Sequence, residues 1–333
     1  MIKIEANTPC PCGSGKQFKQ CCMDSASKQH AQIVEEAQQM LDLNPHLTME
    51  ELNVLMQHKM NERNNQPNPD FCGLSSHQVS NWLYAPFNEL KDIKITTPHD
   101  VSASPVMRYL ALMLDEAMQN DGSFKATIRG NLPAKLVKQA SELLPQFAVA
   151  KYNTNISLSE FAGSNEDKFN ALHYTRVLAE IAGIIHRKSG CYHVKKAAQK
   201  QYQTQGITTF FMPMLEAATS KFNWGYFDIW GDDIDMRLFW VFMLWRVQTH
   251  GSLDALVDEV CTAFPDVLHQ YAPKQYTTRN EQFRACMECR FINRFLAYWG
   301  FATLDPRQFV NQQKISRKIE ILPLLTETFE FLV

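Results

Sequence analysis

The sequence predicts a mainly α protein that is divided into several domains. Apolar residues recur at helical spacing along most of the chain, as in the series Val106, Tyr109, Leu110 and Met113. Candidate strands are few and short, and they fall in the middle of the chain. Four cysteines crowd together near the N-terminus, apart from the periodic segments. A chain of 333 residues has material for one large domain or for two to three modest ones.

The composition is that of an ordinary globular protein. Apolar residues make up 45% of the chain and charged residues 20%, with 13 glycines and 15 prolines. These figures exclude collagen-like, low-complexity and wholly disordered chains. No apolar run approaches the ~20 residues that span a bilayer, and the N-terminus lacks the apolar core of a signal peptide. We therefore expect a cytoplasmic protein without a membrane partner.

The charge is unevenly distributed along the chain. The net charge is −2, but residues 122–202 contain twelve Lys and Arg against five Asp and Glu. The segments on either side are acidic. Such a middle segment predicts either a basic surface for a polyanion or an ordinary solvated surface that is rich in lysine.

A cluster of thiols near the N-terminus predicts a metal site. Cys10, Cys12, Cys21 and Cys22 fall within thirteen residues. Dense thiols in an intracellular protein are more often metal ligands than disulfides, and four thiolates match the tetrahedral preference of zinc. The intervening Gly13-Ser14-Gly15 can turn tightly around the ion. We expect all four cysteines to bind one structural zinc ion.

The same segment resembles the SEC-C motif, the zinc-binding tail of the bacterial preprotein-translocase ATPase. The motif reads Cys-Pro-Cys-Gly-Ser-Gly-Lys, then a variable basic and aromatic stretch, then Lys-x-Cys followed by His or Cys. Cys10, Cys12 and Cys21 fall on its first three ligand positions and Cys22 on the fourth. Gln17, Phe18 and Met23 depart from the usual residues without removing a ligand.

This resemblance implies binding and not catalysis. In the translocase, the tail is an interaction module for a chaperone and for the ribosome. A closed site with four protein ligands has no open position at which to activate water. The Gly13-Ser-Gly-Lys16 run is not a phosphate-binding loop, because the glycine spacing is too short and Gln17 replaces the required Ser or Thr. A protein partner is therefore expected.

Capping signals and periodicity predict the other elements. A polar helix is expected over Ser27–Met40, and a second over Thr48–Met60 with a capping box between Thr48 and Glu51. Residues 61–70 are predicted to form a linker, and Ser75 with Gln78 another capping box. Further helices are predicted over residues 104–119, 168–182 and 195–202, and another is predicted to start at residue 131. A strand is predicted over residues 124–127, and a hairpin with a Ser-Gly turn over residues 184–194.

Two helices followed by a basic hairpin resemble a winged helix. In this interpretation, residues 181–188 carry the end of a recognition helix into its wing, and the unit before it is a degenerate second copy. Winged helices bind nucleic acid through a helix in the groove and wing contacts to the backbone. Five cations without an intervening acid are therefore candidate phosphate ligands: Arg187, Lys188, Lys195, Lys196 and Lys200. The alternative is a winged unit that serves protein interaction or structure only.

The C-terminal third is predicted to be helical with an aromatic core. Phe283, Met287, Phe291 and Phe295 recur every four residues, so they are expected to face inward. Arg290 and Arg294 lie off this stripe and are expected on a solvated flank. Four acids precede the helix that starts near Met236 and are interpreted as caps rather than as a cation site: Asp228, Asp232, Asp233 and Asp235.

No convincing set of catalytic residues emerges. Cys286 and Cys289 form a CxxC in mid-helix without a matching second pair, so buried thiols are favoured over redox or metal roles. Cys191, His193 and His186 are a weak three-ligand candidate.

A nuclease pattern is also weak. Pro69-Asp70 with Glu89 and Lys91 formally matches the loose pattern of metal-dependent nucleases, which requires paired strands. We expect a protein that binds rather than one that catalyses.

These observations combine into one prediction of organisation and function. We expect a SEC-C zinc knuckle over residues 1–24, a helical linker over 25–70, a winged-helix-like region over 71–203 and a helical domain over 204–333. The expected function is that of a zinc-binding, non-catalytic adaptor. The alternatives are a nucleic-acid-binding regulator and, less favoured, a metal-dependent nuclease.

Overall fold

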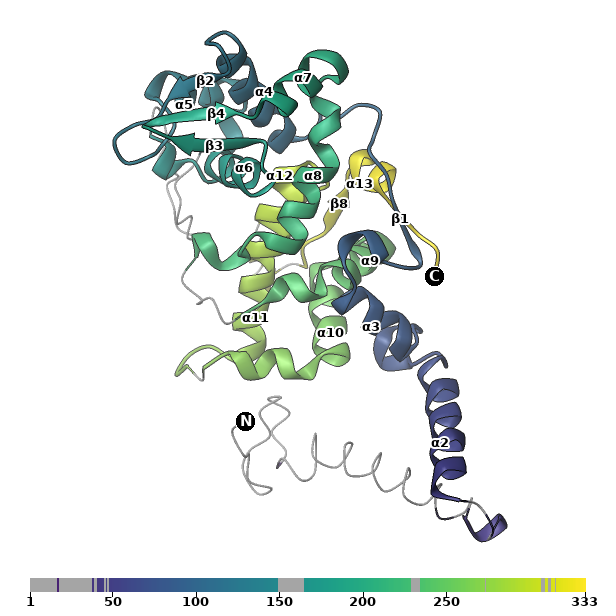
Figure 1. Ribbon diagram of the computed structural model, residues 1–333. Coiled ribbons are helices and arrows are strands. Elements are labelled where there is room, and N and C mark those ends of the chain that lie inside the picture. Colours follow the sequence, from purple (N-terminus) through teal and green to yellow (C-terminus); the bar gives the residue numbers. More distant parts are fainter. Residues whose placement is uncertain are drawn as a thin grey trace. The chain divides into compact units, whose positions relative to one another are not determined.

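The computed structural model describes most of the chain (Figure 1). The described residues are 17, 38, 41–44, 46, 48–148, 165–228, 234–272, 274–306, 309–310, 313–314 and 316–333. Nearly all of the predicted polar helix over Ser27–Met40 lies outside these residues. The described part of the chain is mainly helical, as predicted. None of its helices is long and apolar enough to cross a membrane.

The chain folds into two compact units. One combines the described residues of Met1–Tyr84 with Ala255–Ala285, and the other combines Ala85–Asp254 with Cys286–Val333. The helices of the first unit are α2 (Met49–Asn64), α3 (Ser76–Tyr84), most of α10 (Leu253–Ala263) and most of α11 (Arg279–Met287).

Capping boxes start the first two of these helices. The Thr48 hydroxyl accepts a hydrogen bond from the Glu51 N–H at 3.2 Å, and the Thr48 N–H donates to Glu51 Oε2 at 2.9 Å. Ser75 and Gln78 make the equivalent pair of bonds before α3. Both predicted boxes are confirmed. Helix α2 runs to Asn64, four residues past its predicted end. Leu52 is buried in it, and Leu55 is 42% exposed.

Helix α4 (Pro105–Met118) packs against several other elements of the second unit. Ser104 caps it by accepting a hydrogen bond from the Met107 N–H, and Pro105 occupies its first turn. The predicted inward residues Val106, Tyr109 and Leu110 are fully buried. The other helices of this unit are α5 (Ala134–Leu143), α6 (Asn170–Ile181), α7 (Lys196–Gln205), α8 (Phe211–Glu216), α9 (Trp240–His250), α12 (Ala297–Trp299) and α13 (Pro323–Thr328).

The strands form small antiparallel sheets. The largest has the order β2-β4-β3 and consists of β2 (Ser123–Lys125), β3 (Ile185–Lys188) and β4 (Cys191–Val194). The two-stranded sheets are β1 (Ile93–Ile95) with β9 (Phe329–Phe331), β5 (Ala302–Leu304) with β8 (Ile319–Ile321), and β6 (Phe309–Val310) with β7 (Gln313–Lys314).

The predicted strand near residue 124 belongs to the same sheet as the hairpin. β2 pairs with β4, with Phe124 opposite Tyr192. Two chain segments that the sequence suggested as separate copies therefore form a single unit, whose order along the chain is α4, β2, α5, α6, β3, β4. The prediction of a degenerate second copy is wrong, because pairing with β4 uses the strand of the supposed copy.

The aromatic stripe of the last third is buried, but its arginines are not solvated. Helix α11 is followed directly by a π-helical segment, Glu288–Leu296. Phe291 and Phe295 are buried there, yet Arg290 and Arg294 are only 2% and 8% exposed. The prediction of a solvated basic flank is wrong, because Asp228 lies against both guanidinium groups.

The predicted acidic caps divide into two kinds. Asp235 accepts a hydrogen bond from the Arg237 N–H and caps the short helix Met236–Phe239, as expected. Asp228 is instead the buried carboxylate that pairs with Arg290 and Arg294. Asp232 and Asp233 lie outside the described residues.

Candidate functional site

The four expected zinc ligands lie outside the described residues. Cys10, Cys12, Cys21 and Cys22 can therefore be assessed by donor chemistry alone, and four thiols within thirteen residues fit a zinc ion. Five cysteines lie among the described residues and form no disulfide there: Cys72, Cys191, Cys261, Cys286 and Cys289. No group of three or more His, Cys, Asp or Glu in that part of the chain could hold a metal ion.

The β2-β4-β3 sheet has an apolar inner face and a polar outer face. On the inner face, Phe124 and Tyr192 are buried and their rings lie 5.5 Å apart. Because side chains alternate along a strand, Cys191 and His193 point to the opposite face. There Lys125 and Lys188 flank Cys191 on the two neighbouring strands. The outer face is thus polar and carries cations.

The five predicted phosphate ligands divide into two groups at opposite ends of the hairpin. Arg187 and Lys188 are exposed at the end of β3, beside the Ser189-Gly190 turn. Lys195, Lys196 and Lys200 are exposed where β4 ends and α7 begins. None of the five has an ion-pair partner among the described residues. At ~3.3 Å per residue, the length of a four-residue strand separates the two groups by roughly 10 Å.

Two of these cations pack over backbone glycines. Gly130 has a φ of +84°, and a Cβ atom on it would overlap the Arg187 guanidinium. Gly183 has a φ of +71°, and a Cβ atom there would lie 2.8 Å from Lys195 Nζ. Arg187 and Lys195 are thus held close to the body of the unit, whereas Lys188 extends from the outer face of the sheet.

Helix α6 has no exposed face. Nine of its twelve residues are buried, and Val177, Glu180 and Ile181 are half-buried. A recognition helix must lay one solvated face in the major groove. The expectation that α6 ends as a recognition helix is therefore wrong in this structure, and any contact with nucleic acid is left to the hairpin and α7.

A buried charge cluster that the sequence analysis missed fixes α6 in place. Glu166 accepts hydrogen bonds from the Leu132 N–H and from Arg176 Nε, the latter at 2.6 Å. Arg176 also pairs with Glu180, and His173 Nδ1 lies 3.5 Å from Glu166. The i, i+4 spacing of Arg176 and Glu180 was visible in the sequence, but nothing in it marked Glu166 as their partner.

Burial and the ion pair shift the pKa values of Glu166 and Arg176 in opposite directions. Burial raises the pKa of Glu166, and the Arg176 guanidinium opposes that shift without cancelling it. Burial lowers the pKa of Arg176, but Glu166, Tyr192 and Glu180 together raise it by more, so it lies above its ordinary value. Burial also raises the pKa of Tyr192 to about 12. The charges of Glu166 and Arg176 are paired with each other, and we interpret their role as holding α6 in place.

The structure does not bring the residues of the weaker catalytic candidates together in the arrangement that each would need. Asp70 lies in the short helix Pro69–Phe71 and Glu89 in Phe87–Glu89, so neither half of the nuclease pattern is on a paired strand. Burial raises the pKa of the Cys289 thiol, and Cys286 is fully buried, which is unfavourable for redox chemistry. His186 and His193 do meet across the hairpin, without a third ligand.

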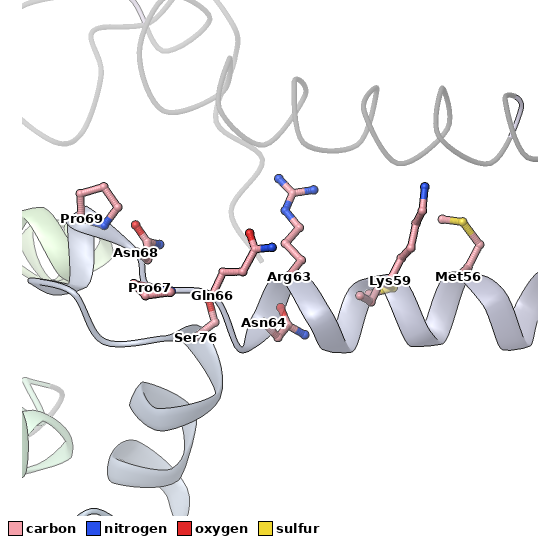
Figure 2. A pocket seen from close by; sticks show the side chains of 10 residues that line it. Met56, Lys59, Arg63, Asn64, Gln66, Pro67, Asn68, Pro69 and Ser76 are labelled. Atoms are coloured by element: carbon pink, nitrogen blue, oxygen red, sulfur yellow. The ribbon is translucent and has the colours of Figure 1, made fainter. Parts of the chain in front are cut away.

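A polar cavity of about 370 Å³ lies at the C-terminal end of α2 in the first unit. Figure 2 shows Met56, Lys59 and Arg63 side by side along the helix, facing the same side, with the loop from Gln66 to Pro69 beyond its end. An apolar cavity of about 430 Å³ in the second unit is lined by Phe87, Ile93, Ile95, Met212, Pro213 and their neighbours. No hydrogen bond joins a nucleophile to a base among the described lining residues of either cavity, so neither cavity supports a catalytic assignment.

Comparison with known proteins identifies the N-terminal segment alone. A family model, the SEC-C motif, matches residues 7–24 and so contains all four cysteines of the predicted knuckle. This confirms the resemblance that the sequence suggested. No curated protein and no solved structure matches the chain.

Proposed function

We propose that this protein is a non-catalytic adaptor whose N-terminal SEC-C segment folds around one zinc ion and docks a protein partner. The match of the SEC-C model to residues 7–24 carries the proposal. A peptide of that length cannot bury a core of its own, so a metal with four thiolates would supply its folding energy. The zinc ion would be structural, bound by Cys10, Cys12, Cys21 and Cys22.

The zinc content and partner binding test this function together. The purified chain should contain about one zinc ion, and Cys21→Ser should remove most of it. Cys72→Ser is the matched control, because Cys72 forms no disulfide and lies outside the knuckle residues. A partner captured from a lysate and then purified should bind the wild type and the Cys72→Ser variant, and bind Cys21→Ser at least about tenfold more weakly. If Cys21→Ser keeps both its zinc and its partner, the proposal is wrong.

A second candidate function is sequence-independent binding of nucleic acid. The order α4, β2, α5, α6, β3, β4 and the sheet order β2-β4-β3 support the interpretation of this region as a winged-helix-like unit. Arg187 and Lys188 are exposed at the turn of its hairpin without an acidic partner in the described chain. Because α6 is buried, the contacts would be to phosphates and would not distinguish one base sequence from another.

Salt dependence and charge reversal test this candidate. Binding to duplex DNA and to RNA should fall steeply with salt, and the double variant Arg187→Glu, Lys188→Glu should bind more weakly with a shallower salt slope. The control is Lys59→Glu, Lys274→Glu, which makes the same charge change at two exposed lysines of the first unit. An equal loss of affinity in both double variants would mean that only the net charge of the protein matters. The hairpin would then be rejected as the binding surface.

A further inference from the structure

The outer face of the β2-β4-β3 sheet carries a pair of histidines that neither proposed function uses. His186 on β3 lies directly opposite His193 on β4 (Figure 1 shows the two strands side by side). Their ring centroids are 5.5 Å apart, and the ring planes are inclined by 27°. Neither imidazole has a hydrogen-bond or ion-pair partner in the part of the chain that the structure describes. Both rings therefore have nitrogens available for a ligand.

The distance between the two rings is close to the distance between two imidazoles that bind the same metal ion. A metal–nitrogen distance of about 2.1 Å puts the ion about 3.2 Å from each ring centroid, so the centroids lie roughly 4.5–5.2 Å apart at bond angles of 90–110°. The observed 5.5 Å differs from this range by a few tenths of an ångström. His186 is exposed and His193 half-buried, so both rings can turn about their side-chain bonds without disturbing the core. The pairing of β3 with β4 fixes the backbone at both positions.

The donors and their surroundings limit which ions would bind. Neutral imidazole favours late transition metals such as nickel, copper and zinc over the oxygen-seeking magnesium and calcium. Cys191 lies two residues from His193 on the same face but does not complete a three-ligand group. Lys125 and Lys188 lie beside Cys191 and would repel a cation, so the affinity would be below that of a site with three protein ligands.

We propose that His186 and His193 bind one late transition metal ion through one nitrogen each, with water in the remaining positions. The ion would link β3 to β4 at their middle and hold the hairpin closed. This site uses none of the four knuckle cysteines and does not depend on either proposed function. Its charge would add to that of the basic outer face.

Nickel titration of the full chain with its zinc in place tests the site. Calorimetry should show one saturable site in the wild type, and His186→Ala or His193→Ala should each weaken it at least about tenfold, because even outer-shell groups are worth about 10- to 100-fold in metal affinity. His99→Ala is the control, since His99 is an exposed histidine outside the sheet. Nickel should also raise the melting temperature of the wild type and of His99→Ala, but not that of the two hairpin variants.

Two results would overturn the proposal. One is the absence of saturable binding to the wild type up to about 1 mM nickel. The other is nickel affinity that survives both hairpin substitutions, which would place the ion at the cysteines or at other histidines. Should a variant fail to fold, modification of the wild type with diethyl pyrocarbonate decides: nickel must protect His186 and His193 together, and modification of both in the presence of nickel rejects the site.

Discussion

Asp228 accepts two parallel hydrogen bonds from Arg290, with both Nε and Nη2 of the guanidinium at 2.8 Å from a carboxylate oxygen. Arg294 donates to the same carboxylate at 3.2 Å, and all three side chains are nearly inaccessible to water. One carboxylate therefore faces two buried cations. The arrangement is stable only while every charge keeps its hydrogen bonds, because unpaired buried charges are costly.

Replacement of Asp228 should strongly destabilise the second unit. Asp228→Asn keeps the shape of the side chain but removes the negative charge that Arg290 and Arg294 face in the interior, so we expect a loss of about 3 kcal/mol or more in the free energy of unfolding. Urea unfolding followed by tryptophan fluorescence measures it. The control is Asp235→Asn, a half-exposed cap, which should cost no more than about 1 kcal/mol. Equal losses in the two variants would show that the buried pair contributes nothing special.

Removal of Arg176 should make stability depend more steeply on pH. Arg176→Met leaves Glu166 buried without its cation, so the pKa of Glu166 should rise further above its ordinary value. A carboxyl whose pKa is raised by folding stabilises the protein while protonated, and that stability is lost as pH rises through the raised pKa. Relative to the wild type, the variant should therefore lose more stability as the pH rises from the ordinary carboxyl range through the raised pKa. A parallel pH dependence in the two proteins would contradict this.

Alanine at Gly130 should cost more than alanine at Gly190. Both glycines have a positive φ, +84° and +74°, so both substitutions strain the backbone. At Gly130 the new methyl group would also displace Arg187, whereas nothing lies within 4 Å at Gly190. We expect a difference of at least about 1 kcal/mol in the free energy of unfolding. Similar costs would mean that Arg187 moves aside freely.

Two partly buried thiols, Cys261 and Cys289, should resist alkylation in the native protein. Burial raises the pKa of Cys289, and burial together with Asp258 raises that of Cys261 to about 12. The thiolate is the reactive form, so iodoacetamide at slightly alkaline pH should label both slowly, and full labelling should follow unfolding in urea. Mass spectrometry of tryptic peptides gives the rates. Fast native labelling of Cys289 would reopen a redox role for the CxxC.

Local signals in the sequence were sufficient for many element boundaries. The caps at Thr48, Ser75 and Ser104 and the Ser189-Gly190 turn each depend on neighbouring residues, and the structure confirms all four. Capping and turn formation are short-range effects, so they can be read along the chain.

Contacts between distant segments could not be read in this way. β1 pairs with β9 more than 200 residues further on, with Lys94 beside Glu330, and three-residue strands leave no clear alternation in the sequence. Arg290 and Arg294 looked solvated because their carboxylate, Asp228, lies about sixty residues earlier. The π-helical turns of residues 288–296 also break the 3.6-residue periodicity on which the prediction depended. The cation positions were found in the sequence, but the burial of α6 depends on packing from the last third of the chain.

The burial of α6 also limits how this protein can be dissected. Tyr174 on α6 receives a hydrogen bond from Trp299 Nε1, and its ring lies 4.9 Å from that of Phe222. A fragment that ended near residue 203 would lack both partners. It would expose to water the apolar surface of α6 that is buried in the full chain. Such a fragment would tend to aggregate and to bind probes non-specifically. Truncation is therefore a poor route to function in this protein, and point substitutions in the intact chain are the sound one.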